Sequence, residues 1–172
     1  MNLKDTIRSV PDFPIEGILF YDITTLLKNP AALKACIDQL ADHYRQADID
    51  LIVGMESRGF IFGMPLAYQL GLGFIPIRKP GKLPAETISE SYALEYGTNS
   101  LEIHVDAIEA GQKVLIVDDL LATGGTAKAT CNLIEKLGGT VAGLAFAIEL
   151  NFLKGREQLV GYDIFSLMQY DE

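Results

Sequence analysis

The sequence has few cysteines, with two among its 172 residues. Cys36 and Cys131 have neither CxxC spacing nor a histidine nearby, which argues against a disulfide framework. Two reduced, partly buried side chains are the simpler interpretation. We therefore expect a protein of a reducing compartment, the cytoplasm.

Positive charge is also scarce, because 14 basic side chains stand against 23 acidic ones and the formal net charge is −9. This balance argues against a general binder of nucleic acid or of anionic membranes. An anionic substrate is not excluded. Such a substrate would need local basic groups, helix N-termini or a metal ion.

Long apolar segments are missing as well. The N-terminal stretch MNLKDTIRSVPDF has no apolar core region, so no signal peptide is expected. Residues 59–77 are uncharged, but four glycines, two prolines and Gln69 interrupt them. They therefore predict a buried helix, a turn and a buried strand rather than a membrane-spanning helix.

Hydrophobic periodicity predicts an α/β protein. The length favours a single domain over residues 1–172, and 49% hydrophobic with 22% charged residues is typical of a globular chain. Strand-like apolar runs alternate with segments of helical periodicity, and this indicates a mainly parallel central sheet flanked by helices. The expected helices cover 31–46, 60–70 and 126–137, and the expected strands cover 51–54, 74–77, 114–117 and 141–150.

Two segments depart from the alternation. Residues 79–104 are rich in turn residues and show some alternation near their end, which is typical of a mobile binding loop that forms an antiparallel hairpin. Residues 1–25, with Pro11, Pro14 and Gly17, are expected to form a separate cap over the domain.

The most informative stretch is VLIVDDLLATGGTA, residues 114–127. A strand leads into Asp118 and Asp119, then into a Thr/Gly turn and a helix. Open α/β sheets bind ligands at the carboxyl ends of their strands. Two carboxylates at such a position can accept hydrogen bonds from ribose hydroxyls, or orient Mg²⁺ through water.

The turn itself predicts a phosphate site. Gly124 and Gly125 allow the backbone to approach a ligand closely. The N–H groups at the start of the next helix, with the helix dipole, suit an anion, and Thr123 and Thr126 add hydroxyl donors. The plain alternative, Thr126 as an ordinary helix cap, explains one residue of the run.

The run VLIVDDLLATGGT resembles the binding signature for phosphoribosyl pyrophosphate (PRPP) of type I phosphoribosyltransferases, in the form DDLLATGGT of their adenine-specific branch. It fits neither a Walker A loop nor a GxGxxG fingerprint. The resemblance extends along nearly the whole chain, to the tail LKGREQL and FSLMQYDE. It implies the type I phosphoribosyltransferase fold, with an N-terminal hood over residues 1–25 and a flexible β-hairpin loop over residues 79–104.

The resemblance also implies an activity. Adenine and PRPP would react to give AMP and pyrophosphate in a homodimer, with no nucleic-acid or membrane partner. Ala122–Thr126 would hold the 5′-phosphate, and Asp118 and Asp119 would hold the ribose. The cofactor would be Mg²⁺, held mainly by PRPP and through water by the two aspartates, without a strong protein ligand.

The segment GMESRGFIFG, residues 54–63, follows a predicted strand. Ser57 could cap a helix, and Arg58 could be a solvated charge. The segment resembles the family's pyrophosphate loop, which carries a non-proline cis peptide that would fall at Glu56-Ser57. The resemblance therefore places Ser57 and Arg58 against phosphate oxygens, with Arg58 in catalysis.

The segment RKPGK, residues 78–82, gathers three cations on an acidic protein. A solvated basic turn is the ordinary interpretation. The segment resembles the family's RKxGKLP element, which implies that Arg78, Lys79 and Lys82 bind PRPP. In the family this element can reach the partner subunit's active site.

The segment SYALEYG, residues 91–97, lies in the expected hairpin loop. Glu95 and Tyr96 could be loop surface. In the family the corresponding loop closes over the site and its glutamate contacts the imidazole edge of adenine. Closure matters because water could intercept a cationic, ribosyl-like transition state. The resemblance implies a catalytic Glu95 with Tyr96 in support.

The segment PDFPIEGILFYDIT, residues 11–24, resembles the family's adenine-binding hood. Phe20 would stack on the base, and the backbone of Leu19 and Tyr21 would bind its Watson–Crick edge. Many relatives have a basic residue at the position of Tyr21, which leaves backbone recognition unaffected. Leu120 and Leu150 would enclose the base from the main domain. The alternative for these apolar side chains is ordinary core packing.

Three other functions compete. A non-catalytic PRPP regulator of transcription usually carries a nucleic-acid-binding module, for which this chain lacks the length and the charge. A phosphoacceptor domain would explain Asp118 and Asp119, but the immediate ATGGT and the lack of a clear later lysine partner argue against it. Transfer to hypoxanthine or guanine is the nearest alternative.

Overall fold

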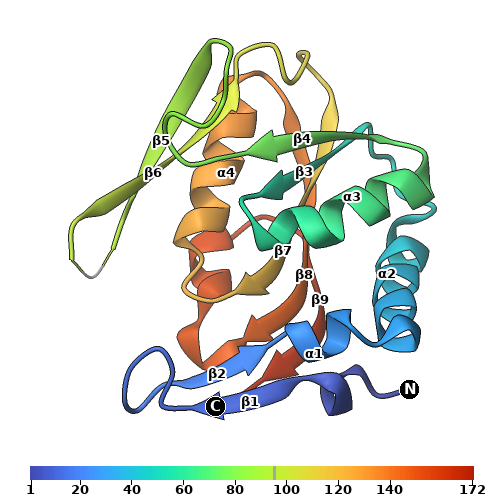
Figure 1. The fold of residues 1–172 in the computed structure, drawn as a ribbon. Coiled ribbons are helices and arrows are strands. Elements are labelled where there is room, and N and C mark those ends of the chain that lie inside the picture. The colour runs from blue at the N-terminus through green and yellow to red at the C-terminus, as the bar shows by residue number, and fades with distance from the viewer. Residues whose placement is uncertain (95) are drawn as a thin grey trace.

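The computed structural model describes residues 1–94 and 96–172 (Figure 1). A five-stranded sheet in the order β4-β3-β7-β8-β9 forms its centre, and each neighbouring pair is parallel. The mainly parallel sheet expected from the sequence is confirmed. The strands are β3 (Leu51–Met55), β4 (Gly73–Ile77), β7 (Lys113–Leu121), β8 (Thr140–Leu150) and β9 (Ile164–Tyr170).

Three helices form where the periodicity predicts them, and the short first helix was not predicted. The helices are α1 (Thr24–Leu27), α2 (Pro30–Tyr44), α3 (Arg58–Leu70) and α4 (Gly125–Lys136). The Asn29 side chain caps α2 by accepting hydrogen bonds from the N–H groups of Ala31 and Ala32. Gly71 ends α3 in the left-handed conformation, with φ 71°.

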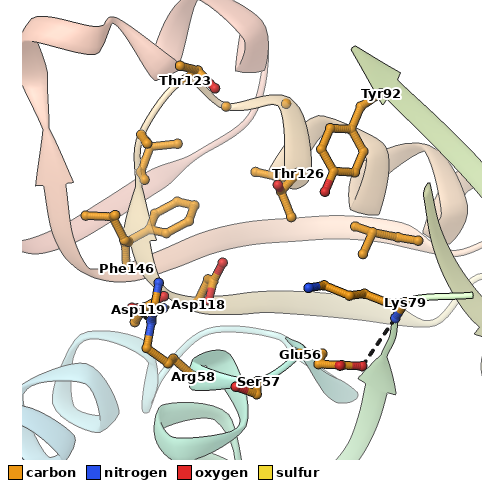
Figure 2. Close-up of a pocket in the computed structure, with 17 residues that line it drawn as sticks. Glu56, Ser57, Arg58, Lys79, Tyr92, Asp118, Asp119, Thr123, Thr126 and Phe146 are labelled. Carbon is orange, nitrogen blue, oxygen red and sulfur yellow. Dashed lines mark hydrogen bonds and ion pairs between the residues drawn. The ribbon is translucent and has the colours of Figure 1, made fainter. Parts of the chain in front are cut away.

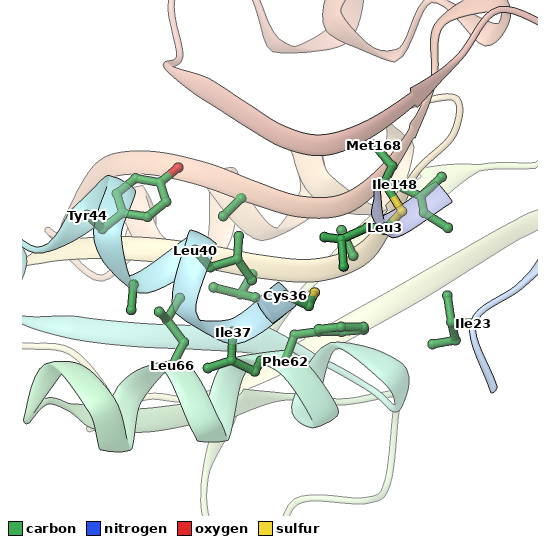
Figure 3. Packing of buried hydrophobic residues seen from close by; sticks show 14 of the residues in the cluster. Leu3, Ile23, Cys36, Ile37, Leu40, Tyr44, Phe62, Leu66, Ile148 and Met168 are labelled. Carbon is green, nitrogen blue, oxygen red and sulfur yellow. The ribbon is translucent and has the colours of Figure 1, made fainter. Parts of the chain in front are cut away.

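The helices cover both faces of the sheet (Figure 1). On one face, Cys36 and Leu40 of α2 and Phe62 and Leu66 of α3 pack in the same buried cluster as Ile148 of β8 (Figure 3). A second cluster lies on the opposite face, beneath α4 and the hairpin β5–β6. Each large apolar side chain buried in this way stabilises the fold by about 1.5–3 kcal/mol.

Two antiparallel hairpins stand apart from the central sheet. The first consists of β1 (Arg8–Pro11) and β2 (Leu19–Asp22), after the 3₁₀ helix η1 (Leu3–Thr6). It forms the hood expected over residues 1–25. The second consists of β5 (Thr87–Ala93) and β6 (Thr98–His104), and it confirms the antiparallel hairpin expected within residues 79–104.

Three further details differ from the sequence-based expectation. β7 continues four residues past Val117, because it pairs with β8 as far as Leu121, so Asp118 and Asp119 lie within the strand. The edge strand β9 was not predicted, since its half-buried side chains show no clear alternation. The 3₁₀ helices η2 (Asn151–Leu153) and η3 (Gly155–Leu159) between β8 and β9 were also missed.

Candidate active site

A polar cavity of about 380 Å³ opens at the carboxyl ends of β3 and β7 (Figure 2). Its lining brings together segments that are far apart in the sequence. They are the start of α3, the end of β7, the turn into α4, Lys79 and both strands of the hairpin β5–β6. Of the predicted site residues, the lining contains Ser57, Arg58, Lys79, Asp118, Asp119, Leu120, Ala122, Thr123, Gly124, Gly125 and Thr126.

The phosphate loop, Ala122–Thr126, forms one wall of this polar cavity. Gly124 has φ 90° and ψ −4°, and α4 begins at the next residue. No side chain caps the helix, so the alternative of Thr126 as an ordinary cap has no hydrogen bond to support it. The free N–H groups of the first helical turn therefore point to an anion site.

Asp118 and Asp119 lie opposite the phosphate loop, and Arg58 bonds to Asp119 (Figure 2). Its Nε donates a hydrogen bond of 2.6 Å to Oδ2 of Asp119, and the Asp119 N–H donates one of 2.8 Å to Oδ1 of Asp118. Burial and the neighbouring Asp119 charge raise the pKa of Asp118 well above its ordinary value. Half of the Arg58 side chain remains exposed, at 52%, and is free to meet a second anion.

Glu56 holds the basic turn in place. The peptide Glu56-Ser57 is cis, as the resemblance implied. Arg78 Nε donates to Oε1 of Glu56 at 3.0 Å and the Lys79 N–H donates to the same oxygen at 3.3 Å. Partial burial raises the pKa of Glu56, but these hydrogen bonds outweigh it and leave the pKa below its usual value.

The three cations of the basic turn are therefore placed differently. Lys79 lines the polar cavity. Arg78 and Lys82 line neither this cavity nor the second one described below. Any contact of these two side chains with substrate requires another arrangement or another subunit.

The hairpin loop contributes Tyr92, which sequence reasoning did not single out. Its ring lies beside Gly125, 3.5 Å from where a Cβ would stand (Figure 2). Tyr96 is 86% exposed and lines neither described cavity. Glu95 lies outside the described residues. Glu56 was also missed, although its place directly before Ser57 in the GMESRG motif was a usable signal.

An apolar cavity of about 610 Å³ lies between the hood and the sheet. All five residues predicted to bind adenine line it: Leu19, Phe20, Tyr21, Leu120 and Leu150. Further apolar side chains, not predicted from the sequence, complete the wall: Val10, Phe13, Ile18, Ile23 and Ile148. The ring of Phe13 meets that of Phe20 edge to face at 5.1 Å.

The polar and apolar cavities meet at three residues. Arg58 and Asp119 line both of them, and so does Leu120. A ligand in the apolar cavity would therefore approach a ligand in the polar cavity at this junction. Phe20 is half-buried rather than part of the core, so its face is available to a planar ligand.

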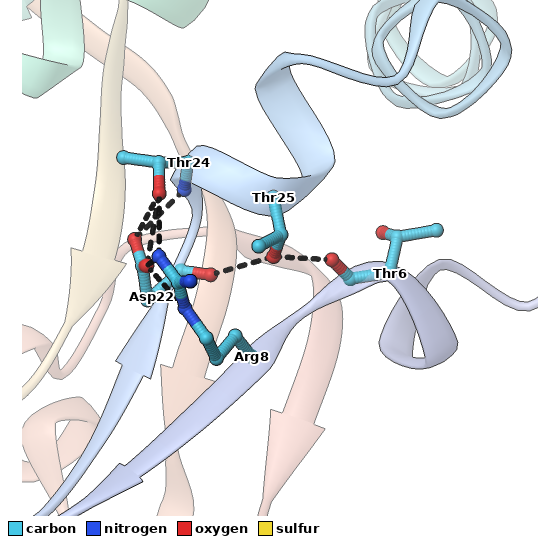
Figure 4. A network of polar contacts seen from close by, with 5 residues as sticks. All are labelled: Thr6, Arg8, Asp22, Thr24 and Thr25. Carbon is cyan, nitrogen blue, oxygen red and sulfur yellow. Dashed lines mark hydrogen bonds and ion pairs between the residues drawn. The ribbon is translucent and has the colours of Figure 1, made fainter.

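A polar network fastens the hood beside the apolar cavity (Figure 4). Arg8 Nε donates to Asp22 at 3.0 Å, and the Thr24 N–H donates to the same carboxylate at 2.9 Å. The backbone hydrogen bond from Thr24, with that of Arg8, lowers the pKa of Asp22 to about 2. Thr25 Oγ1 donates to the Thr6 carbonyl at 2.6 Å and joins the two hood segments.

Two features are absent from the described residues. No helix within them combines the length and apolar character that a membrane span requires. No group of three or more His, Cys, Asp or Glu side chains within them is arranged to hold a metal ion. Cys36 and Cys131 are free and buried, as expected, and burial raises the pKa of each thiol to about 12.

Comparison with known proteins explains this arrangement. The model of the phosphoribosyl transferase domain matches residues 22–166. The adenine phosphoribosyltransferase of Acidobacterium capsulatum is 61% identical over 170 residues, which cover 99% of this chain and 94% of the relative. The chain belongs to the adenine phosphoribosyltransferase family.

Solved structures of the family agree with the fold. The adenine phosphoribosyltransferase of Thermoanaerobacter pseudethanolicus superposes with a TM-score of 0.95 at 57% identity, covering 98% of each chain. The Saccharomyces cerevisiae enzyme, in complex with an imino-altritol bisphosphate and adenine, has a TM-score of 0.90 at 45% identity and covers 96% of each chain. The central sheet with its hood and hairpin is thus the type I phosphoribosyltransferase fold.

Proposed function

We propose that the polar cavity binds PRPP, that the apolar cavity binds adenine, and that the ribose C1 passes from pyrophosphate to adenine N9 at their junction. The observation that carries this proposal is the pair of cavities, opposite in character, that share Arg58 and Asp119. The yeast relative binds adenine together with a bisphosphate, which supports one site for each kind of ligand.

Each wall of the polar cavity has a part in binding PRPP. The N–H groups of the phosphate loop hold the 5′-phosphate. Asp118 and Asp119 accept hydrogen bonds from the ribose hydroxyls. The exposed half of Arg58, with Ser57 and Lys79, neutralises the pyrophosphate as it leaves.

The chemistry is a displacement at C1. The N9 lone pair of adenine forms the new bond, and the electron pair of the broken C1–O bond leaves with pyrophosphate. We assign the imidazole proton to Glu95, which the family resemblance puts at the imidazole edge of adenine, with Tyr96 in support. Phe20, Leu120 and Leu150 hold the base in a water-poor site, which protects a ribosyl cation from water.

Mg²⁺ fits this site when it arrives with PRPP. The donors in the polar cavity are carboxylate oxygens, the kind that Mg²⁺ accepts, but the described residues form no cluster that could hold it alone. Asp118 and Asp119 would therefore hold it through water, beside oxygens of PRPP. Its contribution when bound is positive charge against the phosphates.

A homodimer completes the proposal. Ile61, Met64 and Tyr68 stand at i, i+3 and i+7 on α3 and are 40%, 52% and 89% exposed, so they form an apolar stripe facing outward. A second copy of the chain would cover this stripe and could bring its own basic turn to the site. The free buried cysteines support a cytoplasmic location.

The test is release of pyrophosphate from PRPP and Mg²⁺ with adenine, hypoxanthine or guanine as acceptor. An amino group at C6 of the purine donates a hydrogen bond where an oxo group accepts one, so the backbone of Leu19 and Tyr21 should discriminate strongly. We expect kcat/KM for adenine to exceed that for the other purines by orders of magnitude. Similar kcat/KM values for adenine and guanine would refute the assignment of adenine as the acceptor. Binding of AMP without any release of pyrophosphate would indicate a non-catalytic regulator.

A further inference from the structure

A buried carboxylate outside the two cavities needs an explanation. Asp119 and Glu149 are charged residues with almost no exposed surface, and Glu149 is only 3% exposed. Asp119 lines both cavities, whereas Glu149 lines neither. Removing a carboxylate from water is costly unless it is paired and hydrogen-bonded.

Glu149 is fully paired. Arg156 donates twice, from Nε to Oε2 at 2.8 Å and from Nη2 to Oε1 at 2.9 Å, and Ser166 Oγ donates to Oε1 at 2.7 Å. Burial raises the pKa of Glu149, but the hydrogen bonds from Arg156 and Ser166 outweigh it and lower the pKa below the usual value. The carboxylate therefore stays charged, in the two-pronged geometry that fixes an arginine most firmly.

The pair joins a rigid element to an irregular one. Glu149 lies near the end of β8, paired in register with Leu121 of β7 and Gln169 of β9. Arg156 belongs to the short 3₁₀ helix η3, Gly155–Leu159. The ion pair therefore ties η3 to β8, an interior strand of the sheet.

η3 is also the back wall of the phosphate loop. A Cβ at Gly124 would stand 2.6 Å from the Gly155 carbonyl oxygen, and a Cβ at Gly155 would stand 2.5 Å from the Ala122 carbonyl oxygen. The two backbones thus touch with no room for a methyl group between them. Any displacement of η3 must change the phosphate loop.

We infer that Glu149 and Arg156 are positioning residues for the phosphate loop, which they reach through η3. The inference rests on the proposed binding of a phosphate by Ala122–Thr126. The ion pair holds Gly155 against the loop, so that the N–H groups at the start of α4 keep the spacing that a phosphate requires. No residue of η3 lines the apolar cavity.

Arg156→Ala tests the inference, with Arg45→Ala as control. Both arginines are about equally exposed, at 49% and 46%, and Arg45 pairs with Asp42 at the end of α2. We expect Arg156→Ala to raise the KM for PRPP and the Kd for AMP by about tenfold, with the KM for adenine unchanged. Arg156→Lys, which keeps the charge, should recover part of the loss, and Arg45→Ala should behave as wild type.

Gly155→Ala tests the same contact without touching the ion pair. Its methyl group would press on the Ala122 carbonyl, so PRPP and AMP should bind more weakly while adenine binds normally. Gly143→Ala is the control, because a Cβ there meets nothing closer than 3.4 Å. If Arg156→Ala does not fold, the double variant Glu149→Gln and Arg156→Gln, which removes both charges, replaces it. The same KM and Kd values are then measured.

The outcomes separate the two proposals. A wild-type protein that neither binds AMP nor consumes PRPP would overturn the proposed function itself. An active wild type, with folded variants at Arg156 and Gly155 that keep normal KM for PRPP and normal AMP affinity, would overturn the inference alone. A lower melting temperature with unchanged KM would assign the pair a structural role and would likewise overturn it.

Discussion

Gly124 gives the phosphate loop its shape, and Gly124→Ala tests that loop directly. The backbone at Gly124 has φ 90° and ψ −4°, a left-handed conformation that costs a residue with a Cβ about 1–2 kcal/mol. The added methyl group would also stand 2.6 Å from the Gly155 carbonyl oxygen and 3.0 Å from Cβ of Gln158. The backbone must therefore move away from its phosphate-binding conformation.

The expected magnitude follows from these two costs. A relaxed loop must return to the left-handed conformation to hold a phosphate. The free energy of binding therefore weakens by at least the cost of that conformation, about 1–2 kcal/mol, which is about five- to thirtyfold in affinity. The contact with Gly155 adds to this loss. We expect the Kd for AMP, measured by titration calorimetry, to rise at least about tenfold, with adenine still bound normally.

Gly111→Ala is the matched control. Gly111 has φ 87° but nothing within 4 Å of its missing Cβ, and it lines neither described cavity. It should lower the melting temperature through the same backbone strain and leave AMP binding intact. A folded Gly124→Ala protein with wild-type AMP affinity would show that the loop does not hold the phosphate.

Three further predictions concern other parts of the molecule. Glu95→Gln should lower kcat by about 10²–10⁴-fold with AMP affinity retained, and a wild-type kcat would remove Glu95 from the mechanism. Tyr68→Glu places a charge in the exposed stripe of α3 and should shift the sedimentation of a dimer to that of a monomer, whereas Tyr68→Phe should not; a dimer in both would place the interface elsewhere. The pKa of Asp22, about 2, lies below the ordinary 3.8, so the carboxylate's contribution to stability is complete above about pH 4 and is lost as the pH falls toward 2. The difference in melting temperature between wild type and Asp22→Asn should therefore narrow over that interval, and a constant difference would contradict the assignment.

The sequence by itself determined the layout of the fold. Helical periodicity in α2, α3 and α4, and the apolar runs of β3, β4, β7 and β8, gave a parallel sheet with helices on both faces. Such patterns are local, because each is formed by residues that lie within a few helical turns, or within one strand, of one another in the sequence. The motif segments around Ser57, Asp118 and Gly124 were visible for the same reason.

Only the tertiary structure decided how those segments meet. Arg58 and Asp119 are 61 residues apart, and they touch because β3 and β7 are paired in register, Gly54 opposite Val117. Only the folded chain shows that the Lys79 side chain lines the polar cavity while the Arg78 side chain pairs with Glu56.

The same holds for the parts that the sequence did not predict. The strand β9 is half-buried and has no strong alternation of its own, so its place is fixed by pairing with β8. Glu149 gave no local sign of function, since an isolated glutamate in an apolar strand acquires its partners, Arg156 and Ser166, only when the chain folds back. Periodicity and turn chemistry are encoded in short stretches of chain, whereas contacts between distant residues exist only once strand order and register are set.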